Sequence, residues 1–185
     1  MPQQLCDTIH LPENLPLMIR EGIVKGLILV GYFDPKTVAA LNEMIPCVRI
    51  AQHDPSATMD CVDHDDMRSM LLLIEHFKSM GHRKIGLVRT GSHLSFNRSR
   101  TAAYVEAVMA SGMEWDSNLL LQISDQQQDG EKVTARQIKK HIKQGVTAWI
   151  CTNDDAGYRQ MRALRNLGVN VPDDVSLCGF DHNIA

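Results

Sequence analysis

Short apolar runs and longer amphipathic segments alternate along most of the chain. The short runs are rich in valine, isoleucine and leucine, which is typical of strands buried in a parallel sheet. The longer segments place apolar residues three and four positions apart, and this spacing predicts helices with a buried face. The expected strands span 27–30, 46–51, 59–62, 85–88, 118–123, 147–151 and 175–178, and the expected helices span 12–24, 35–44, 65–80, 100–109, 129–143 and 154–167.

This alternation predicts an α/β fold, because strands that alternate with helices of this length form parallel sheets with right-handed crossovers. The segment 81–88 opens a second series of strands and helices, after a glycine that ends the helix 65–80. We therefore expect two lobes, the first over residues 1–81 and the second over 82–185. Apolar residues cover more than one stripe of helix 65–80, which favours burial on two sides and is consistent with a contact between subunits of a homodimer.

Composition narrows the class of protein. With 185 residues, of which 44% are hydrophobic and 22% charged, the chain is typical of a soluble globular protein. A formal net charge of −3 and the lack of any lysine or arginine run argue against direct nucleic-acid binding by these residues. The sequence contains neither a signal peptide nor an apolar segment long enough to span a membrane. Five cysteines without C-x-x-C spacing indicate reduced thiols in a cytoplasmic protein.

Asp181 is the first candidate for a ligand-binding residue. It follows the expected strand 175–178, which is preceded by the helix-ending Gly168 and by Pro172. Open α/β sheets bind ligands beyond the carboxyl ends of their strands, so a carboxylate at this place is well positioned to contact one. An ordinary loop or helix-capping aspartate is the alternative interpretation.

Three more polar residues are expected at the same edge. Asn153 and Asp154 come directly after strand 147–151, and Arg100 begins the helix 100–109. The Asn amide and the carboxylates suit vicinal hydroxyls, whereas the forked donors of arginine suit hydroxyls or a carboxylate. The alternatives are that Asn153 or Asp154 caps the following helix and that Arg100 is a solvated surface residue.

A cluster of histidine and carboxylate side chains spans Asp63, His64, Asp65 and Asp66. Such side chains are metal ligands, but their spacing here matches no known ligand pattern. A loop followed by a helix start with favourable negative charge explains the same residues. We therefore expect no metal site and no cofactor, and the sequence also lacks a G-x-S-x-G elbow and a phosphate-binding glycine loop.

Several of these segments together resemble one family. The segments G-H-R-K-I-G, beginning at Gly81, C-T-N-D, beginning at Cys151, and V-P-D-D-V-S-L-C-G-F-D, ending at Asp181, occur in this order in the LacI/GalR family of bacterial transcription regulators. Arg98 to Tyr104 resembles the family's R-x-x-G-Y/F segment. Gly157 stands where the family commonly has alanine, and His182 stands where it has a second aspartate.

The resemblance implies a periplasmic-binding-protein-like fold of type I, with two Rossmann-like parallel-sheet lobes that are incomplete in this chain. It implies effector binding by Arg100, Asn153, Asp154 and Asp181, and it adds Asp63 and Asp66 because they lie in the family's V-x-x-D-N segment. The small-molecule effector is then a carbohydrate, and the protein is a homodimer. Operator DNA is bound only through a helix-turn-helix headpiece that we do not find in this sequence, so we expect a fragment truncated at both ends.

The function expected from the sequence is effector sensing in a transcriptional repressor, without catalytic residues and without enzymatic activity. A solute-binding protein of a sugar transporter is the alternative with the same fold, and the missing signal peptide argues against it. A cytosolic α/β enzyme is the third possibility, and the lack of a matched nucleophile and base argues against that one.

Overall fold

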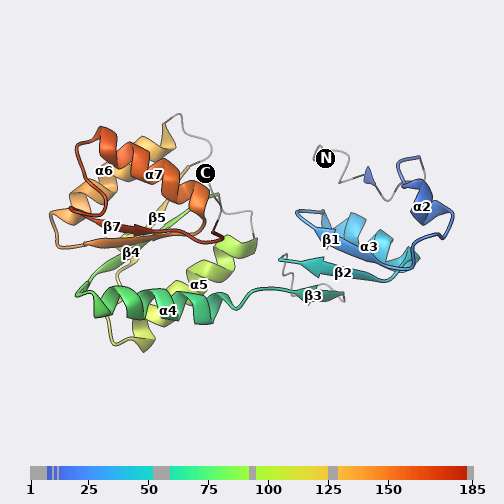
Figure 1. Cartoon of the computed structure of the whole chain (residues 1–185), viewed down its shortest axis with the longest axis horizontal. Coiled ribbons are helices and arrows are strands. Elements are labelled where there is room, and N and C mark those ends of the chain that lie inside the picture. The colour runs from blue at the N-terminus through green and yellow to red at the C-terminus, as the bar shows by residue number, and fades with distance from the viewer. Residues whose placement is uncertain are drawn as a thin grey trace. The chain divides into compact units, whose positions relative to one another are not determined.

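A computed structural model describes residues 8–9, 11, 13–51, 59–91, 95–124 and 129–182. The chain divides into two compact units, Met1–His64 and Asp65–Ala185, each of which contains one parallel sheet (Figure 1). The first unit contains α2 (Leu17–Arg20), β1 (Leu27–Val30), α3 (Pro35–Met44), β2 (Cys47–Ile50) and β3 (Asp60–Val62). The second contains α4 (Asp66–Ser79), β4 (Ile85–Arg89), α5 (Ser95–Ala110), the 3-10 helix η1 (Ser117–Leu119), β5 (Leu120–Gln122), α6 (Gly130–Ile142), β6 (Ala148–Cys151), α7 (Asp154–Asn166) and β7 (Ser176–Cys178).

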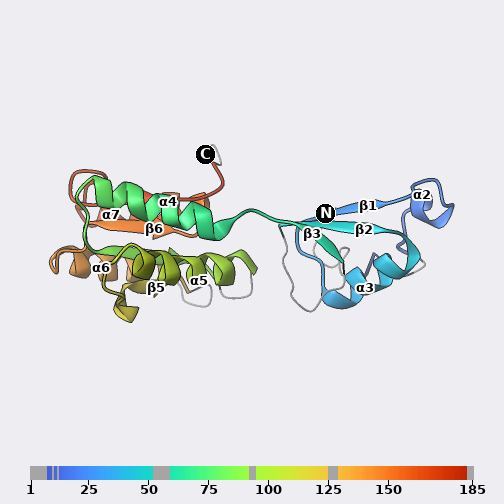
Figure 2. The ribbon, with the colours of Figure 1, turned by 90° about the horizontal axis from the view of Figure 1, so that it is seen from below.

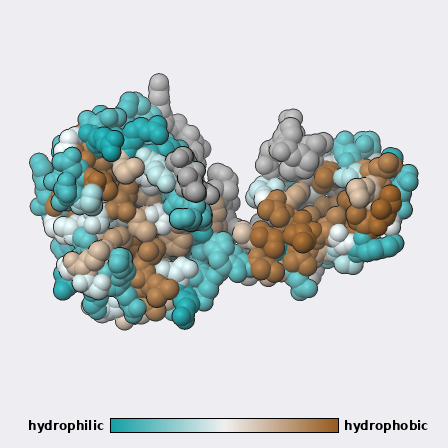
Figure 3. All heavy atoms as spheres, viewed as in Figure 1, coloured by the Kyte–Doolittle hydropathy of each residue, from teal (hydrophilic) through white to brown (hydrophobic). Residues whose placement is uncertain are grey.

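The sheet of the first unit has the order β1-β2-β3. Helix α3 begins at Pro35 after the cap residue Asp34, whose carboxylate accepts hydrogen bonds from the next free backbone N–H groups. Its buried residue Leu41 packs in one cluster with Leu29 of β1 and Cys47 of β2. Successive side chains of a strand point to opposite faces of the sheet, so the residues on either side of Leu29 in β1 are exposed. Figure 3 shows apolar surface over the strands of this unit.

The sheet of the second unit has the order β5-β4-β6-β7, and all its strands are parallel. Helices α4 and α5 cover one face, where Ile74 and Tyr104 pack against Ile85 and Ile150. Helices α6 and α7 cover the other face, and Figure 2 views the unit from the side of α4 and α5. The expected α/β fold with parallel sheets is therefore confirmed. The carboxyl ends of β4, β6 and β7 lie next to one another at one edge, where such sheets bind ligands.

The lack of a side chain at Gly86 leaves the space that the ring of Trp149 occupies. The two residues are register partners in β4 and β6, and a Cβ atom on Gly86 would lie 2.3 Å from ring carbons of Trp149. We expect Gly86→Ala to lower the free energy of unfolding by about 1–3 kcal/mol, the usual effect of overpacking a core. Urea unfolding of the purified chain measures this change.

Gly157→Ala is the matched control for that variant. A Cβ atom on Gly157, in helix α7, would meet its nearest neighbours at 3.9 Å, which is an ordinary van der Waals contact. Alanine at this helical position should leave the stability unchanged or raise it by up to about 1 kcal/mol. Equal stability of the two variants would show that the Trp149 ring does not occupy the space next to Gly86.

One helix differs from the expectation. The predicted helix 12–24 is wrong, because only α2 is helical between residues 13 and 24; Gly22 there has a φ of +64°, which ends the helix early. The chain passes from the first compact unit to the second between His64 and Asp65, and α4 belongs to the second unit because it packs on α5. The assignment of 1–81 and 82–185 as functional lobes stays a prediction.

Within the described ranges, every helix is too short or too polar to cross a bilayer.

Candidate functional site

The guanidinium of Arg100 joins three segments at the carboxyl edge of the second sheet. Its Nε donates to Asp66 Oδ1 at 3.1 Å, its Nη2 donates to Asp181 Oδ1 at 2.9 Å, and its Nη1 donates to the backbone oxygen of Thr152 at 2.5 Å. Asp66 begins α4, Thr152 follows β6 and Asp181 follows β7. Arg100 is only 3% exposed, so these contacts replace the water that an arginine normally binds.

Two aromatic rings flank the same cation. The Cζ atom of Arg100 lies 5.2 Å from the ring centroid of Phe96 and 4.3 Å from that of Phe180. Both distances allow a cation–π interaction, which is strongest where water is excluded. The expected interpretation of Arg100 as a ligand-binding residue stays a prediction, but a solvated surface arginine is excluded by its burial.

The two carboxylates that bind Arg100 differ in exposure. The side chain of Asp66 is 6% exposed, whereas that of Asp181 is 37% exposed. Asp181 also has a φ of +90°, and this strained conformation is uncommon for a non-glycine residue. Of the two carboxylates, Asp181 is therefore the one that a ligand reaches first.

Asn153 and Asp154 lie next to this cluster, at the start of α7. The Asn153 side chain accepts a hydrogen bond from the backbone N–H of Ala156 at 2.8 Å, so it acts as the N-cap of the helix. Asp154 lies against Gly179, where a Cβ atom would be 2.2 Å from the Asp154 carboxylate. A cavity of about 180 Å³ at this place is lined by Asp154, Gly157, Tyr158, Met161, Val171, Leu177, Cys178 and Gly179.

The candidate residue Asp63 belongs to the first unit. Its carboxylate accepts the backbone N–H of His64 at 2.9 Å and lies 3.0 Å from Nδ1 of the same histidine. Asp65 caps α4 by accepting from the Arg68 N–H at 2.8 Å. Asp63, Asp65 and Asp66 thus have separate roles, and the described residues contain no group of three metal-ligating side chains.

Burial keeps two cysteines near the site in the thiol form. Cys151 ends β6 and Cys178 ends β7. Removal from water raises the pKa of both thiols, and the nearby carboxylate of Asp154 raises each pKa further. Since the thiolate is the reactive form, neither residue is poised as a nucleophile at neutral pH.

Four residues at or beside Arg100 were not predicted as site residues from the sequence: Thr152, Phe96, Phe180 and Asn97. Thr152 contributes a backbone oxygen, which any residue type offers, so the sequence contains no signal for it. Phe180 lies in the segment that resembles the LacI/GalR family, so this resemblance could have identified it as a candidate site residue. Asn97 is buried and hydrogen-bonded through its side chain, although the sequence around it has no apolar periodicity that would indicate burial.

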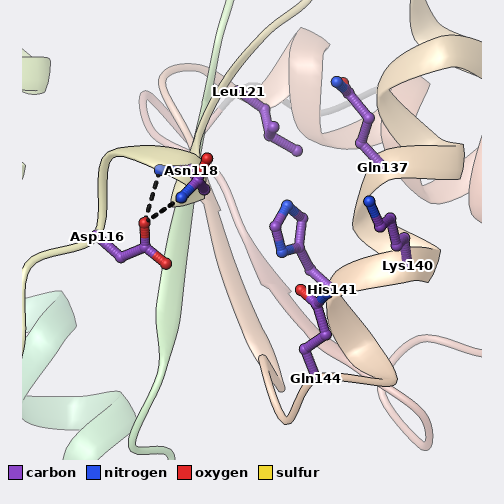
Figure 4. Close-up of a pocket in the computed structure, with 7 residues that line it drawn as sticks. All are labelled: Asp116, Asn118, Leu121, Gln137, Lys140, His141 and Gln144. Atoms are coloured by element: carbon purple, nitrogen blue, oxygen red, sulfur yellow. Dashed lines mark hydrogen bonds between the residues drawn. The ribbon is translucent and has the colours of Figure 1, made fainter.

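A larger pocket lies at the opposite edge of the same sheet. It has a volume of about 420 Å³ and is lined by Asp116, Asn118, Leu121, Gln137, Lys140, His141 and Gln144. Figure 4 shows Asp116 and Asn118 on one side and the α6 side chains facing them. Most of these polar side chains are exposed, and the hydrogen bonds drawn join only Asp116 to Asn118. We place the candidate site at Arg100, because buried charged groups from distant segments meet there.

Comparison with known proteins identifies the family of this chain. A family model described as the periplasmic binding protein-like domain matches residues 74–185. The HTH-type transcriptional regulator DegA of Bacillus subtilis is 26% identical over 97% of this chain and 55% of its own length. The arabinose metabolism transcriptional repressor of Geobacillus stearothermophilus is 28% identical over 91% of this chain and 48% of its own length. The chain thus spans about half the length of these curated relatives.

Solved structures show the same fold. A regulatory protein of the LacI family from Chloroflexus aggregans has a TM-score of 0.79 at 20% identity, over 98% of this chain and 64% of that one. A LacI-type regulator from Bacillus cereus subsp. cytotoxis has a TM-score of 0.71 at 25% identity, over 90% of this chain and 59% of that one. The chain therefore belongs to the periplasmic binding protein-like domain family, and the members it resembles here are transcriptional regulators of the LacI type.

Proposed function

We propose that this chain is the effector-sensing part of a LacI-type transcriptional repressor, and that its effector is a neutral carbohydrate. The observation that supports this proposal best is the convergence of Arg100, Asp66 and Asp181 at the carboxyl edge of the second sheet. Polar groups that are buried together at this edge are the usual way in which an α/β fold binds a small molecule.

The chemistry of the cluster favours hydroxyl groups as ligands. A carboxylate accepts hydrogen bonds from two neighbouring hydroxyls, and a guanidinium donates to their oxygens. Phe96 and Phe180 add apolar surface that suits the C–H face of a sugar ring. Asp66 and Asp181 already outnumber the single cation of Arg100, so a phosphorylated or carboxylated ligand would meet net repulsion.

Structural neighbours with bound sugars support the same effector class. The structure of the transcriptional regulator CelR is a cellobiose complex, with a TM-score of 0.69 to this chain at 22% identity. A LacI family regulator from Lactobacillus casei contains bound sucrose, with a TM-score of 0.68 at 19% identity. These are properties of those proteins, and they make cellobiose and sucrose the natural first probes here.

In the complete regulator, effector binding shifts the balance between two conformations of a homodimer. A ligand changes that balance only by its difference in affinity for the two states. Operator DNA is bound by a helix-turn-helix headpiece and not by the residues of this acidic chain. The chain itself acts in the cytoplasm, catalyses no reaction, and needs no metal or cofactor.

Asp181→Ala tests the proposed site in the presence of ligand. We expect cellobiose, sucrose or another neutral sugar to raise the melting temperature of the chain, since a ligand at 100 times its Kd adds about 2.7 kcal/mol. The variant should lose that shift, because it removes the exposed carboxylate of the cluster. Thermal unfolding with a panel of neutral sugars and their phosphorylated forms measures both effects.

Asp173→Ala provides the control, because Asp173 is an exposed aspartate of the same unit that lies outside the cluster. This variant should keep the full shift. A sugar that stabilises Asp181→Ala as much as the unmodified chain would remove Asp181 from the site. Stabilisation by phosphorylated sugars alone would contradict the neutral effector.

A further inference from the structure

A buried network of hydrogen bonds lies beside Arg100. The Nδ2 of Asn97 donates to Thr90 Oγ1 at 3.0 Å and to the backbone oxygen of Gly91 at 2.5 Å. The Oγ1 of Thr152 donates to Asn97 Oδ1 at 2.7 Å. The exposed fractions are 6% for Thr90, 1% for Asn97 and 0% for Thr152, so water does not compete for these bonds.

This network links the ends of two neighbouring strands to the first turn of α5. Thr90 and Gly91 follow β4, Thr152 follows β6, and Asn97 lies one turn before Arg100 on the helix. Thr152 connects the network to Arg100, because its hydroxyl donates to Asn97 and its backbone oxygen accepts from Arg100 Nη1. The Thr152 backbone N–H also donates to the backbone oxygen of Val88 at 2.9 Å, so the bond to Asn97 is a second constraint on the residue that supplies the acceptor for Arg100.

We propose that Asn97 and Thr152 are positioning residues that hold the Arg100 guanidinium in its binding orientation before any ligand arrives. The inference rests on the proposed function only in taking Arg100 as the group that the ligand contacts. A side chain that is already ordered loses little further rotamer freedom on binding, and this makes the bound state more favourable. Asn97 and Thr152 need not touch the ligand to have this effect.

The burial of Asn97 also bears on whether this residue could carry a glycan. Asn97-Arg98-Ser99 matches the pattern of a glycosylation acceptor, but the Asn97 side chain is 1% exposed and its amide nitrogen donates two hydrogen bonds. A glycan cannot be attached to this nitrogen in the folded chain without breaking both bonds. The asparagine therefore serves the network.

Nuclear magnetic resonance of the arginine side chains in the ligand-free chain tests the proposal. A guanidinium held by three acceptors rotates slowly about its Nε–Cζ bond, so Arg100 should show separate signals for its Nη protons. Arg100→Lys assigns them. We expect Thr152→Val, which removes the hydroxyl that binds Asn97, to merge those signals, and Thr152→Ser, which keeps the hydroxyl, to preserve them.

Thr134→Val is the matched control. Thr134 is also a buried threonine of the second unit, and its hydroxyl donates to the backbone oxygen of Gly130 within α6. Losing this hydroxyl should leave the Arg100 signals unchanged. If Thr152→Val does not fold, Thr90→Val tests the same network, because it removes the hydroxyl that accepts from Asn97. Merged Arg100 signals in the unmodified chain, or separate signals in whichever network variant folds, would overturn the proposal.

Ligand binding provides the second measurement. Any sugar that binds the unmodified chain should bind Thr152→Val about three- to tenfold more weakly and bind Thr152→Ser nearly as well. Equal affinity for the three proteins would overturn the positioning role. If no sugar binds but the Arg100 signals respond as expected, the positioning role stands and the carbohydrate effector is wrong.

Discussion

Replacing Asp66 with alanine is expected to lower the free energy of unfolding of the second unit by about 3–5 kcal/mol. Asp66 is 6% exposed and Arg100 is 3% exposed, so their ion pair at 3.1 Å lies away from water. Without Asp66, the buried guanidinium keeps Asp181 and the Thr152 backbone oxygen but loses a buried carboxylate partner. Chemical unfolding monitored by circular dichroism measures the loss.

Asp181→Ala is the control that shows how much of the lost stability comes from the burial of the ion pair and how much from removing a negative charge. The Asp181 side chain is 37% exposed, so solvent weakens its pair with Arg100 and its removal should cost no more than about 1 kcal/mol. The two variants remove the same charge from the same guanidinium. Equal losses of stability would show that the Arg100–Asp66 pair is not buried in solution.

The double variant Asp66→Leu with Arg100→Met is expected to recover most of the stability lost in Asp66→Ala, yet to bind sugar about 100-fold more weakly. Apolar residues of similar volume often replace a buried ion pair without a loss of stability. Hydrogen bonds to a charged group contribute about 1.5–3 kcal/mol each, and the variant removes those that Arg100 and Asp66 offer a ligand. Unfolding and isothermal titration calorimetry on the same samples measure the two quantities.

Together, the two measurements would separate the contribution of the charged pair to stability from its contribution to sugar binding. A stable double variant with lost affinity assigns the charged groups to ligand binding, since packing alone is enough for the fold. Unchanged affinity in a stable double variant would exclude Arg100 from the site. Lys132→Ala offers a neutral reference for both measurements, because its ion pair with Asp129 is more than half exposed.

Most of the fold was predictable because it depends on local patterns. Strand and helix periodicity and the helix-ending Gly81 are visible in the sequence, and the structure confirms the helix before that glycine. The predicted helix at 12–24 is longer than the helix in the structure. Its apolar spacing is adequate, but α2 begins only after its N-cap residue Pro16, and Gly22 takes a left-handed conformation that prevents the helix from continuing to residue 24.

The site was predictable in part. Arg100 and Asp181 were chosen because they follow a strand or begin a helix, whereas Asp66 was added from the resemblance to the LacI/GalR family. The structure brings these three residues together. The rule does not reveal that Asn153 is a helix cap, since a cap and a ligand residue occupy the same place. It also cannot detect Thr152, whose backbone oxygen has no signature in the sequence.

Chemical-shift mapping of the backbone amides during a sugar titration tests whether the effector binds at Arg100. The probe is whichever neutral sugar raises the melting temperature of the chain. If the effector binds at Arg100, the largest changes should fall on Thr152, Phe180 and Asp181, with little change near the pocket of Asn118 and His141. Changes confined to Asn118, His141 and their neighbours, or no response to any neutral sugar, would contradict the account.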